Sequence, residues 1–522
     1  MESPLKPVKL KNNLWAAAND ERLMLFFSLA AVLIVNIQVL FTFFYADDFI
    51  HLYQIANWSP LEFIFSSFGG HLYIFRNLIF YCMFKLFGLN SVAYFSIVLL
   101  THLVNAYLLY KIIHLLTDKK TLAAAGMMIW GISFANYPSL SWYSAYGHLL
   151  VAFFFLLWLY DLLRIEKKAL FFSGNMAIRW SIYLFLMGAS YGMGLAIVCL
   201  SPAVIVIILW ENDEKWKITS AILPAIALIL LLFIFKDAIY YYFSGEISNS
   251  KASVFGAALS DYKYILKLFI GQCFLNIAFM AAFPVFFLPL TTESPMNLFF
   301  IAIPIVMLFI ILFFRSCQYR RSYAGLSIFF LGIMALLASE HGAGGILSIY
   351  PTMMIIMETR FYYITLMIVV MMLALMADEL LNIFPNISKK IVACVFITIA
   401  VSIYPSIHLA KKNDSWNHSE KDKIIYHDTI FDIKKTIRAY PEGSSVFIDN
   451  TMNEEISFFP TLHIEFPGKA AIFAITYPHN TFEGRRAYFV EKDCHIVDKN
   501  IEKKHWRASS LIVSACDRNK GN

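Results

Sequence analysis

The stretch "LMLFFSLAAVLIVNIQVLFTFF" at residues 23–44 decides the fold class of this chain, because it is apolar over a length that crosses a lipid bilayer. A membrane-spanning helix needs about 17–25 mostly apolar residues. The run is longer than the core of a signal peptide and lacks a small-residue cleavage site, so it predicts an uncleaved anchor. The next residues, "YADDFIHL" at 45–52, place Asp47 beside Asp48 where the apolar run ends.

The composition of the whole chain agrees with this first segment. Of 522 residues, 59% are hydrophobic and only 15% are charged. Soluble domains carry about 25% charged residues, so most of this chain belongs in lipid. The net charge of +6 does not indicate nucleic-acid binding, because the basic residues fall in short clusters between apolar runs. Clusters of that kind orient helices in a membrane.

We predict an α-helical polytopic membrane protein with about 11 transmembrane helices. The run 264–289 is also long enough to cross, but Lys263, Lys267 and Pro284 favour an interfacial or re-entrant segment there. The eleven predicted spans are 23–44, 91–113, 121–137, 145–163, 180–192, 194–210, 217–235, 297–314, 323–338, 361–377 and 390–408.

The loop charges predict the orientation of these spans. Basic residues precede the first span, whereas residues 45–72 contain neither Lys nor Arg. The positive-inside rule therefore places the N-terminus in the cytoplasm and the aspartate pair outside. With 264–289 not crossing, all later basic loops fall inside: Lys119–Lys120, Arg164–Lys168, Lys215–Lys217, Arg315–Arg321 and Lys389–Lys390.

Residues 45–90 form a long first outer loop. The part "HLYIFRNLIFYCMFKLFGLN" at 71–90 is apolar but carries Arg76 and Lys85, so it predicts an interfacial helix that lies along the membrane surface. The loop gathers polar side chains on this surface, namely Asp47, Asp48, His51, Glu62, His71 and Arg76.

After residue 410 the composition changes, and we predict a second domain. Residues 411–522 mix charges with short β-rich runs, "SSVFID", "AAIFAIT" and "AYFV", separated by Pro, Gly and Asn. This pattern and length are typical of a small soluble α/β domain. The domains are therefore 1–410 in the membrane and 411–522 outside, in the periplasm of a bacterium. There Cys494 and Cys516 either pair or remain free thiols.

The membrane half resembles the GT-C glycosyltransferases, multi-spanning enzymes that use lipid-linked sugars. The resemblance rests on the acidic pair after the first span and on the stretch "IFRNLIFYCMFKLFGLNSVAYFSIVLLTHLVNAYLLY" at 74–110. A later stretch, "METRFYYITLM" at 357–367, resembles the one that opens a late helix in protein O-mannosyltransferases and related bacterial branches.

The resemblance implies that Asp47 or Asp48 is the catalytic base, with Asp47 preferred. Sugar transfer needs a base at the acceptor hydroxyl and positive charge at the departing phosphate. Two adjacent carboxylates allow one to take the proton while the other orients the acceptor or holds a metal. Donors with a single phosphate need no metal in this family, whereas diphosphate donors bring Mg²⁺ or Mn²⁺. The alternative is that the pair is a solvated helix end.

Other polar residues are predicted at the same outer face. Arg360 suits a lipid phosphate because its guanidinium offers a fork of donors, and Arg76 is a second candidate; the alternative for each is an arginine at an interface. The remaining predicted substrate-binding residues are His71, Glu340, His341, Glu358 and Tyr362, with His51 as a further hydrogen-bonding candidate. Trp142, Tyr143, Tyr146 and His148 indicate an aromatic belt at the interface.

The preferred function is a glycosyltransferase of the bacterial inner membrane. It would transfer a sugar from a polyprenyl-phosphate donor, with inversion, to an outer acceptor such as O-antigen, another surface polysaccharide or a lipopolysaccharide-type glycolipid. Protein O-glycosylation by the same chemistry is the alternative. A lipid-saccharide flippase is disfavoured because transporters keep ionisable residues at mid-bilayer and show repeats. A ligase or polymerase is disfavoured because residues 339–360 contain a single arginine.

Overall fold

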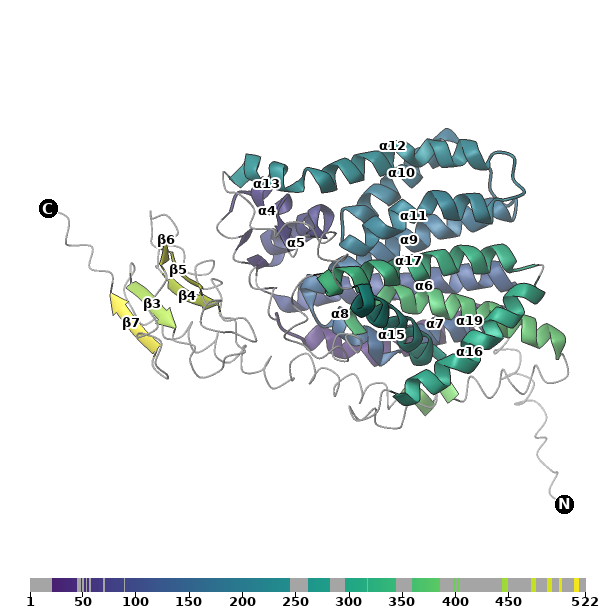
Figure 1. Ribbon diagram of the computed structural model, residues 1–522. Coiled ribbons are helices and arrows are strands. Elements are labelled where there is room, and N and C mark those ends of the chain that lie inside the picture. Colours follow the sequence, from purple (N-terminus) through teal and green to yellow (C-terminus); the bar gives the residue numbers. More distant parts are fainter. Residues whose placement is uncertain are drawn as a thin grey trace, which may run out of the picture.

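The protein is a bundle of α-helices with a small β-sheet near the C-terminus (Figure 1). A computed structural model describes residues 21–44, 48, 51, 52, 54, 55, 58–68, 71–88, 90–244, 262–281, 296–316, 318–343, 359–384, 398, 399 and 401–403, and five strands between 444 and 515. Of these, the side chains of 67, 68, 244, 281, 296–301, 340–343 and the five strands are not described.

The helices follow the apolar runs of the sequence. Their bounds are α2 Glu21–Asn36, η1 Ile37–Phe41, α4 Pro60–Ile64, α5 Ile74–Phe87, α6 Ser91–Thr117, α7 Lys120–Gly131, η2 Phe134–Asn136, α8 Tyr137–Leu140, η3 Tyr143–Ala145, α9 Tyr146–Glu166, α10 Gly174–Gly188, α11 Gly192–Ile208, α12 Lys215–Ile234, α13 Lys236–Ser244, α15 Tyr262–Ala281, α16 Met296–Arg315, α17 Arg320–Ala343, η5 Thr359–Tyr362 and α19 Tyr363–Ile383.

The chain is a multi-pass membrane protein. Within the described residues, seven helical segments are long and apolar enough to cross a bilayer, and two shorter apolar helices, Gly192–Ile208 and Ala302–Arg315, accompany them. Large apolar side chains are exposed along α12, such as Leu223, Leu231 and Ile234. Exposed apolar stripes of this extent are stable when they face lipid. The number of eleven spans stays a prediction, since 390–408 lies mostly outside the described residues.

The structure bears on the predicted course of two helices. The predicted span 121–137 ends already at Gly131, because the chain turns into η2 and α8, and the hydroxyl of Ser133 accepts a hydrogen bond from Ala135 N–H at this turn. The described part of the segment 264–289, up to residue 281, lies in α15, which packs against α16, α17 and α19 and has the length and composition of a span; whether it crosses or stays at the interface remains a prediction. Its lysines lie in the first two turns, where they leave the apolar remainder free to pack.

Helix α6 lies at the centre of the packing, against α7, α9 and α19. Small residues let neighbouring helices approach closely, as is common in membranes. A methyl group on Gly131 would lie 2.6 Å from Val32 of α2, and one on Gly332 of α17 would lie 2.3 Å from Leu200 of α11. Substitution of either glycine would therefore require the facing Val32 or Leu200 side chain to shift.

A polar network inside the bundle joins three helices. His102 of α6 contacts the Tyr363 hydroxyl of α19 at 2.9 Å and the carbonyl of Gly131 of α7 at 3.0 Å. The Asn105 amide donates to the same hydroxyl at 3.3 Å, and Trp130 donates its indole N–H to the Tyr363 carbonyl at 3.3 Å. Buried polar groups in lipid need such partners, so the network fixes the register of α6, α7 and α19.

The basic loops meet at one end of the bundle, which we call the basic end. Lys119 forms an ion pair of 2.7 Å with Asp378, which also accepts a 2.6 Å hydrogen bond from the Tyr319 hydroxyl. Arg321 pairs with Glu211. These contacts bring three of the predicted cytoplasmic loops to the same end, as the charge pattern predicts, and Asp48 follows the first span at the opposite end.

Helices α4 and α5 of the first loop lie at that opposite end, where α4 contacts α13 (Figure 1). Ser59 begins α4 with a capping box, in which its hydroxyl accepts from Glu62 N–H while Glu62 accepts from Ser59 N–H. Two short strands, β1 Ser67–Phe68 and β2 His71–Leu72, pair antiparallel and lead into α5. The predicted interfacial helix is thus present as α5, with Leu86 and Phe87 exposed, but its Arg76 is buried.

The C-terminal strands form a mixed five-stranded sheet. The strands are β3 Ser444–Ile448, β4 Ala471–Ile475, β5 Arg486–Val490, β6 Val497–Lys499 and β7 Leu511–Ala515, in the order β6-β5-β4-β3-β7. Only β3 and β4 pair in parallel. The three runs predicted as β-rich lie in β3, β4 and β5, and the boundary at residue 410 stays a prediction. Cys494 and Cys516 lie outside the described residues.

Candidate active site

Asp48 is fixed at the end of the bundle opposite the basic end. Its carboxylate is fully buried, and its Oδ1 accepts two hydrogen bonds of 2.6 Å from Ser144, one from the backbone N–H and one from the hydroxyl. Ser144 lies in η3, the single turn before α9. Short hydrogen bonds to a carboxylate are among the strong ones in proteins. They tie the end of the first span to the start of α9.

Arg76 is the second buried charge of this region. Only 1% of it is exposed, its guanidinium carbon lies 4.1 Å from the centroid of the Tyr73 ring, and its Nη2 lies 3.2 Å from Nε2 of His51. Arginine can only donate, so this His51 nitrogen accepts and the ring proton is on Nδ1. Nδ1 then donates to Gln54 Oε1 at 3.0 Å.

His51 is therefore a neutral acceptor. Burial, and next the positive charge of Arg76, lower the pKa of His51 well below its ordinary value. A neutral imidazole lets the guanidinium keep its charge without repulsion. The contact between Arg76 and His51 holds the chain after Asp48 against α5. Binding of a ligand by His51 stays a prediction.

The ring of Tyr143 lies near both Asp48 and Arg76. The charges of Asp48 and Arg76 both act on its hydroxyl. The ring stacks on Tyr146 at 5.4 Å between centroids and meets the edge of Phe80 of α5 at 4.7 Å. Aromatic contacts of this kind give a rigid, water-poor wall. The two charges thus lie in one packed cluster, formed by Asp48, Ser144, Arg76, His51 and Tyr143, which we call the Asp48 cluster.

A second cluster, the Arg360 cluster, lies at the same end. The guanidinium carbon of Arg360 lies 4.6 Å from the Trp142 ring centroid and 4.9 Å from that of Phe361. The Arg360 carbonyl accepts a hydrogen bond of 2.9 Å from the Ser139 hydroxyl, which anchors η5 to α8. Trp142 is two residues before Ser144, so the short α8–η3 segment contacts both clusters.

His71 joins the Arg360 cluster through two aromatic rings. Its ring centroid lies 4.7 Å from that of Tyr191, which lies 4.0 Å from that of His148. The His148 ring centroid lies 6.4 Å from that of Phe361, the chain neighbour of Arg360. A methyl group on Gly192 would lie 2.6 Å from His71 Nδ1, so the glycine at the start of α11 makes room for this ring. The predicted residues His71 and Arg360 are therefore brought together.

Of the other predicted site residues, one is buried and the remaining four are not fully described by the structure. Tyr362 is fully buried, and its carbonyl accepts from the Thr365 hydroxyl at 3.0 Å. Asp47 and Glu358 lie outside the described residues, and Glu340 and His341 end α17 with side chains that are not described. Whether these residues bind substrate stays a prediction.

The predicted aromatic belt is wrong for three of its four members. Tyr143, Tyr146 and His148 are at most 2% exposed, because α8 and η3 fold back into the bundle end and bury them. Sequence reasoning missed Ser144, Ser139 and Tyr191, since isolated Ser and Tyr residues carry no recognisable pattern. Only the turn-rich run "YPSLSWYSAYGHLL" marked that region.

The described part of the chain contains no cluster of side chains suited to bind a metal ion. There, no three His, Cys, Asp or Glu side chains are placed to hold an ion together. Asp48 alone among the predicted metal ligands is described, and its Oδ1 is engaged by Ser144. Mg²⁺ or Mn²⁺ therefore stays an expectation tied to a diphosphate donor.

Comparison with known proteins finds a similar solved structure. No family model matches the chain, and no curated protein matches it. Among solved structures, ArnT from Cupriavidus metallidurans bound to undecaprenyl phosphate matches with a TM-score of 0.48 and 11% sequence identity, over 85% of this chain and 85% of ArnT. The chain is a multi-pass helical membrane protein, and it is similar to ArnT over 85% of its length.

Proposed function

We propose that the protein is a membrane glycosyltransferase that moves a sugar from a polyprenyl-phosphate donor to an acceptor hydroxyl. The observation that carries the proposal is the fixed position of the Asp48 carboxylate on Ser144, at the same end of the bundle as the Arg360 cluster. A carboxylate pair and guanidinium groups at one membrane face supply the two charges that this transfer needs.

The reaction we propose is a single displacement with inversion. The Asp47 carboxylate takes the proton of the acceptor hydroxyl, and the acceptor oxygen bonds to the anomeric carbon on the face opposite the phosphate. The bond from that carbon to the phosphate oxygen breaks, and the phosphate keeps the electron pair. A guanidinium beside the leaving phosphate stabilises the added negative charge.

The two aspartates divide the work. Asp48 is a positioning residue, because its Oδ1 is engaged by Ser144 and the residue is shielded from solvent. Asp47 is the catalytic base, in agreement with the preference that the GT-C resemblance implies. The hydrogen bonds of Asp48 to Ser144 restrain the chain next to the proposed base.

Arg360 is the better candidate for the phosphate. Arg76 is almost fully buried between Tyr73 and His51, which is the environment of a supporting residue. Arg360 is only partly buried and lies over Trp142 and Phe361, which orient its guanidinium plane. We assign the leaving phosphate to Arg360 and the support of the first loop to Arg76.

The proposed setting is a bacterial inner membrane, with the Asp48 end on the outer face and the C-terminal strands in the periplasm. The preferred acceptor is O-antigen, another surface polysaccharide or a glycolipid of the lipopolysaccharide type, and a secreted protein is the alternative. These acceptors all present a hydroxyl at the outer face of the membrane, which the same chemistry can use.

A reconstituted assay tests the proposal. The purified protein is placed in proteoliposomes with radiolabelled polyprenyl-phosphate sugars and with outer-leaflet glycolipid or polysaccharide acceptors. We expect label to move onto an acceptor with wild type but not with Asp47→Asn. The matched control is Asp213→Asn, the same change at an exposed residue of the basic end, and it should transfer as wild type does. Label that crosses the bilayer while it stays on the polyprenyl carrier would identify a flippase and overturn the proposal.

A further inference from the structure

A short segment between α7 and α9 contacts both clusters of the candidate site. We call residues 137–145, which include α8 and η3, the bridge segment. In its first half the Ser139 hydroxyl donates to the carbonyl of Arg360 at 2.9 Å. In its second half the backbone N–H and the hydroxyl of Ser144 donate to Oδ1 of Asp48, each at 2.6 Å. One segment therefore holds an arginine and an aspartate of the candidate site.

Hydrogen bonds and burial make the bridge segment a rigid piece of backbone. The N–H of Ser141 donates to the Tyr137 carbonyl at 2.8 Å, and that of Ala145 donates to the Trp142 carbonyl at 3.0 Å. Every residue of the segment is buried except Trp142, which is partly buried. Buried and hydrogen-bonded backbone opens rarely. The contacts that the segment makes with Arg360 and Asp48 are thus held at a fixed separation.

The η5 turn that carries Arg360 is also held from the side of α19. The Thr365 hydroxyl lies 3.0 Å from the Tyr362 carbonyl and 2.7 Å from Oδ1 of Asn276 in α15. The Arg360 side chain is only partly buried, and its guanidinium carbon lies 4.6 Å from the Trp142 ring centroid. The backbone of η5 is therefore fixed, while part of the Arg360 side chain stays accessible to a ligand.

Ser139 is the residue through which the bridge segment contacts the Arg360 backbone. It is fully buried, so water does not replace its hydroxyl when that group is removed. Loss of the hydroxyl deprives the Arg360 carbonyl of this donor and weakens the link between η5 and α8. Because Ser139 is buried, it acts on the reaction through Arg360 and not by contact with a substrate.

We propose that the bridge segment sets the spacing between Arg360 and Asp48, and that Ser139 is a positioning residue for the donor phosphate. The inference rests on the proposed function, in which Arg360 binds the leaving phosphate and Asp48 restrains the neighbouring base. A displacement with inversion needs the acceptor oxygen, the anomeric carbon and the leaving oxygen in line. A rigid segment shared by both clusters fixes the spacing of the groups that hold these atoms.

Donor and acceptor kinetics of Ser139→Ala test this inference in the reconstituted assay. We expect the KM for the polyprenyl-phosphate sugar to rise about tenfold, because Arg360 is less well placed, and the KM for the acceptor to remain that of wild type. A loss of stability alone would lower the active fraction, and hence the apparent kcat, without changing either KM. An unchanged donor KM in folded Ser139→Ala would overturn the proposal.

Ser201→Ala is the matched control for removal of a buried hydroxyl. Ser201 of α11 is also fully buried, and its hydroxyl donates to the Val198 carbonyl of its own helix at 2.7 Å. This variant loses the same group without a change in the bridge segment, so its donor KM should equal that of wild type. A rise in donor KM as large as that of Ser139→Ala would show a general packing effect and overturn the assignment.

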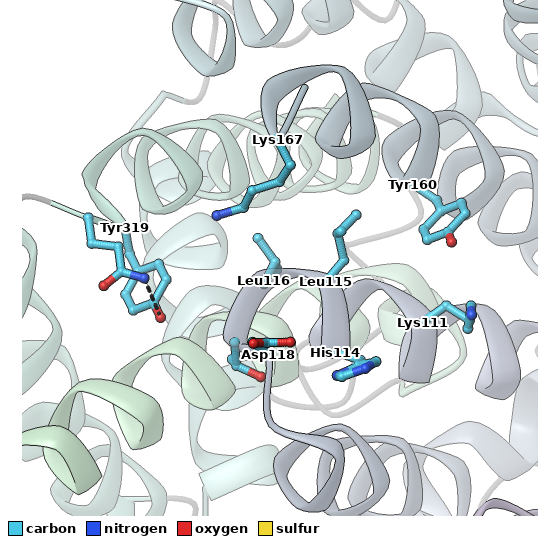
Figure 2. Close-up of a pocket in the computed structure, with 10 residues that line it drawn as sticks. Lys111, His114, Leu115, Leu116, Asp118, Tyr160, Lys167 and Tyr319 are labelled. Atoms are coloured by element: carbon cyan, nitrogen blue, oxygen red, sulfur yellow. Dashed lines mark hydrogen bonds between the residues drawn. The ribbon is translucent and has the colours of Figure 1, made fainter. Parts of the chain in front are cut away.

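Tyr160→Phe is the control for effects transmitted along α9. This helix begins directly after the bridge segment, and Tyr160, in its second half, lines a cavity of about 410 Å³ at the basic end (Figure 2). The variant removes a hydroxyl from the same helix, away from both clusters. Its donor KM should equal that of wild type, and a rise as large as that of Ser139→Ala would count against a specific role of Ser139.

A double-mutant cycle tests whether Ser139 and Ser144 act through one segment. The kcat/KM for the donor is measured for Ser139→Ala, for Ser144→Ala and for the variant with both changes. Contacts that restrain the same rigid segment are coupled, so the loss in the double variant should be smaller than the product of the single losses by about threefold or more. Losses that multiply would show two independent contacts and overturn the role of the bridge segment.

Donor binding without transfer separates this inference from the proposed function. The probe is undecaprenyl phosphate, titrated into the purified protein in detergent and followed by native mass spectrometry. Ser139→Ala should bind it about tenfold more weakly than wild type. Equal binding by the two proteins, with transfer by wild type, would overturn this inference and leave the proposed function intact. Absence of both binding and transfer in wild type would overturn the proposed function and this inference with it.

Discussion

The hydrogen bonds between Asp48 and Ser144 set the expectation for single substitutions in the Asp48 cluster. Ser144→Ala removes the hydroxyl donor and keeps the backbone donor. We expect transfer to fall about tenfold, with an unfolding free energy lower by about 1.5–3 kcal/mol, since one hydrogen bond to a charged group is lost. The measurement is the rate of transfer together with thermal unfolding in detergent.

The outcome for Asp48 differs from that for Asp47. Asp48→Asn should lower both stability and transfer, because the Asp48 carboxylate accepts two hydrogen bonds from Ser144. Asp47→Asn should abolish transfer with unchanged stability, because in the proposed mechanism Asp47 acts only as the base. The comparison separates positioning from proton transfer. Wild-type turnover in Asp47→Asn would remove the proposed base.

Arg360 gives a second prediction at this scale. Arg360→Ala should raise the KM for the donor by about tenfold or more and leave the KM for the acceptor unchanged, because a charged contact to the phosphate is lost. Arg360→Lys should recover part of the loss, since a lysine keeps the charge without the fork of donors. If the dependence on donor is unchanged, the phosphate role belongs to Arg76.

The buried His51 predicts a pH dependence of stability. Its pKa is lowered in the folded protein by burial and by Arg76, while the unfolded chain has a value of about 6.5. Above about pH 6.5 the residue is neutral in both states and its contribution is fully present. As the pH falls below that value, the unfolded chain takes up a proton that the folded chain does not, so stability decreases.

The measurement is the unfolding midpoint of wild type and His51→Gln between about pH 7.5 and 5.5, a range that brackets the titration of the unfolded chain. A glutamine keeps an acceptor for Arg76 but does not titrate, so its midpoint should decrease less than that of wild type over this range. Equal pH dependence in the two proteins would show that His51 is not the group responsible.

At the scale of elements, the polar network between α6, α7 and α19 holds the helices in register. Tyr363→Phe removes the hydroxyl shared by His102 and Asn105. We expect a loss of about 1 kcal/mol in stability, within the range for hydrogen bonds between membrane helices. Tyr242→Phe, at an 82% exposed position of α13, is the control and should have no effect.

The elements were predictable where the signal is local in the sequence. An apolar run of sufficient length determines a span by itself, which is why α2, α6, α9 and α19 lie where they were predicted. For α15 the sequence leaves the course open, because its two lysines and Pro284 suggest an interface while its length and apolar composition allow a span; its packing partners are α16, α17 and α19. Contacts between distant segments decide that case, and a single sequence does not reveal them.

In the candidate site, too, the sequence marks single residues but does not reveal the contacts between distant segments. The acidic pair, Arg76 and Arg360 could be singled out because charges at the ends of apolar runs are conspicuous. The partner of Asp48 is Ser144, 96 residues away, and no pattern in the sequence marks that contact. Burial of Tyr143 and His148 was likewise hidden, because interfacial and buried aromatic residues have the same composition.

At the scale of the whole molecule, the separation of charge between the two ends predicts the topology. The ion pair of Lys119 with Asp378 and that of Arg321 with Glu211 gather the basic loops at one end, and Asp48 lies at the other. A cysteine at position 47 should therefore react with an impermeant maleimide from outside intact cells. Labelling only after the inner face is exposed would reverse the orientation.

The most direct test of the central claim is mass spectrometry of surface polysaccharides and glycolipids from a deletion strain complemented with either wild type or Asp47→Asn. We predict that the deletion lowers the mass of one glycan or glycolipid by a single sugar residue. Wild type should restore that mass, and Asp47→Asn, inserted at the same level, should not. An unchanged glycan profile in the deletion strain, or full restoration by Asp47→Asn, would contradict the assignment.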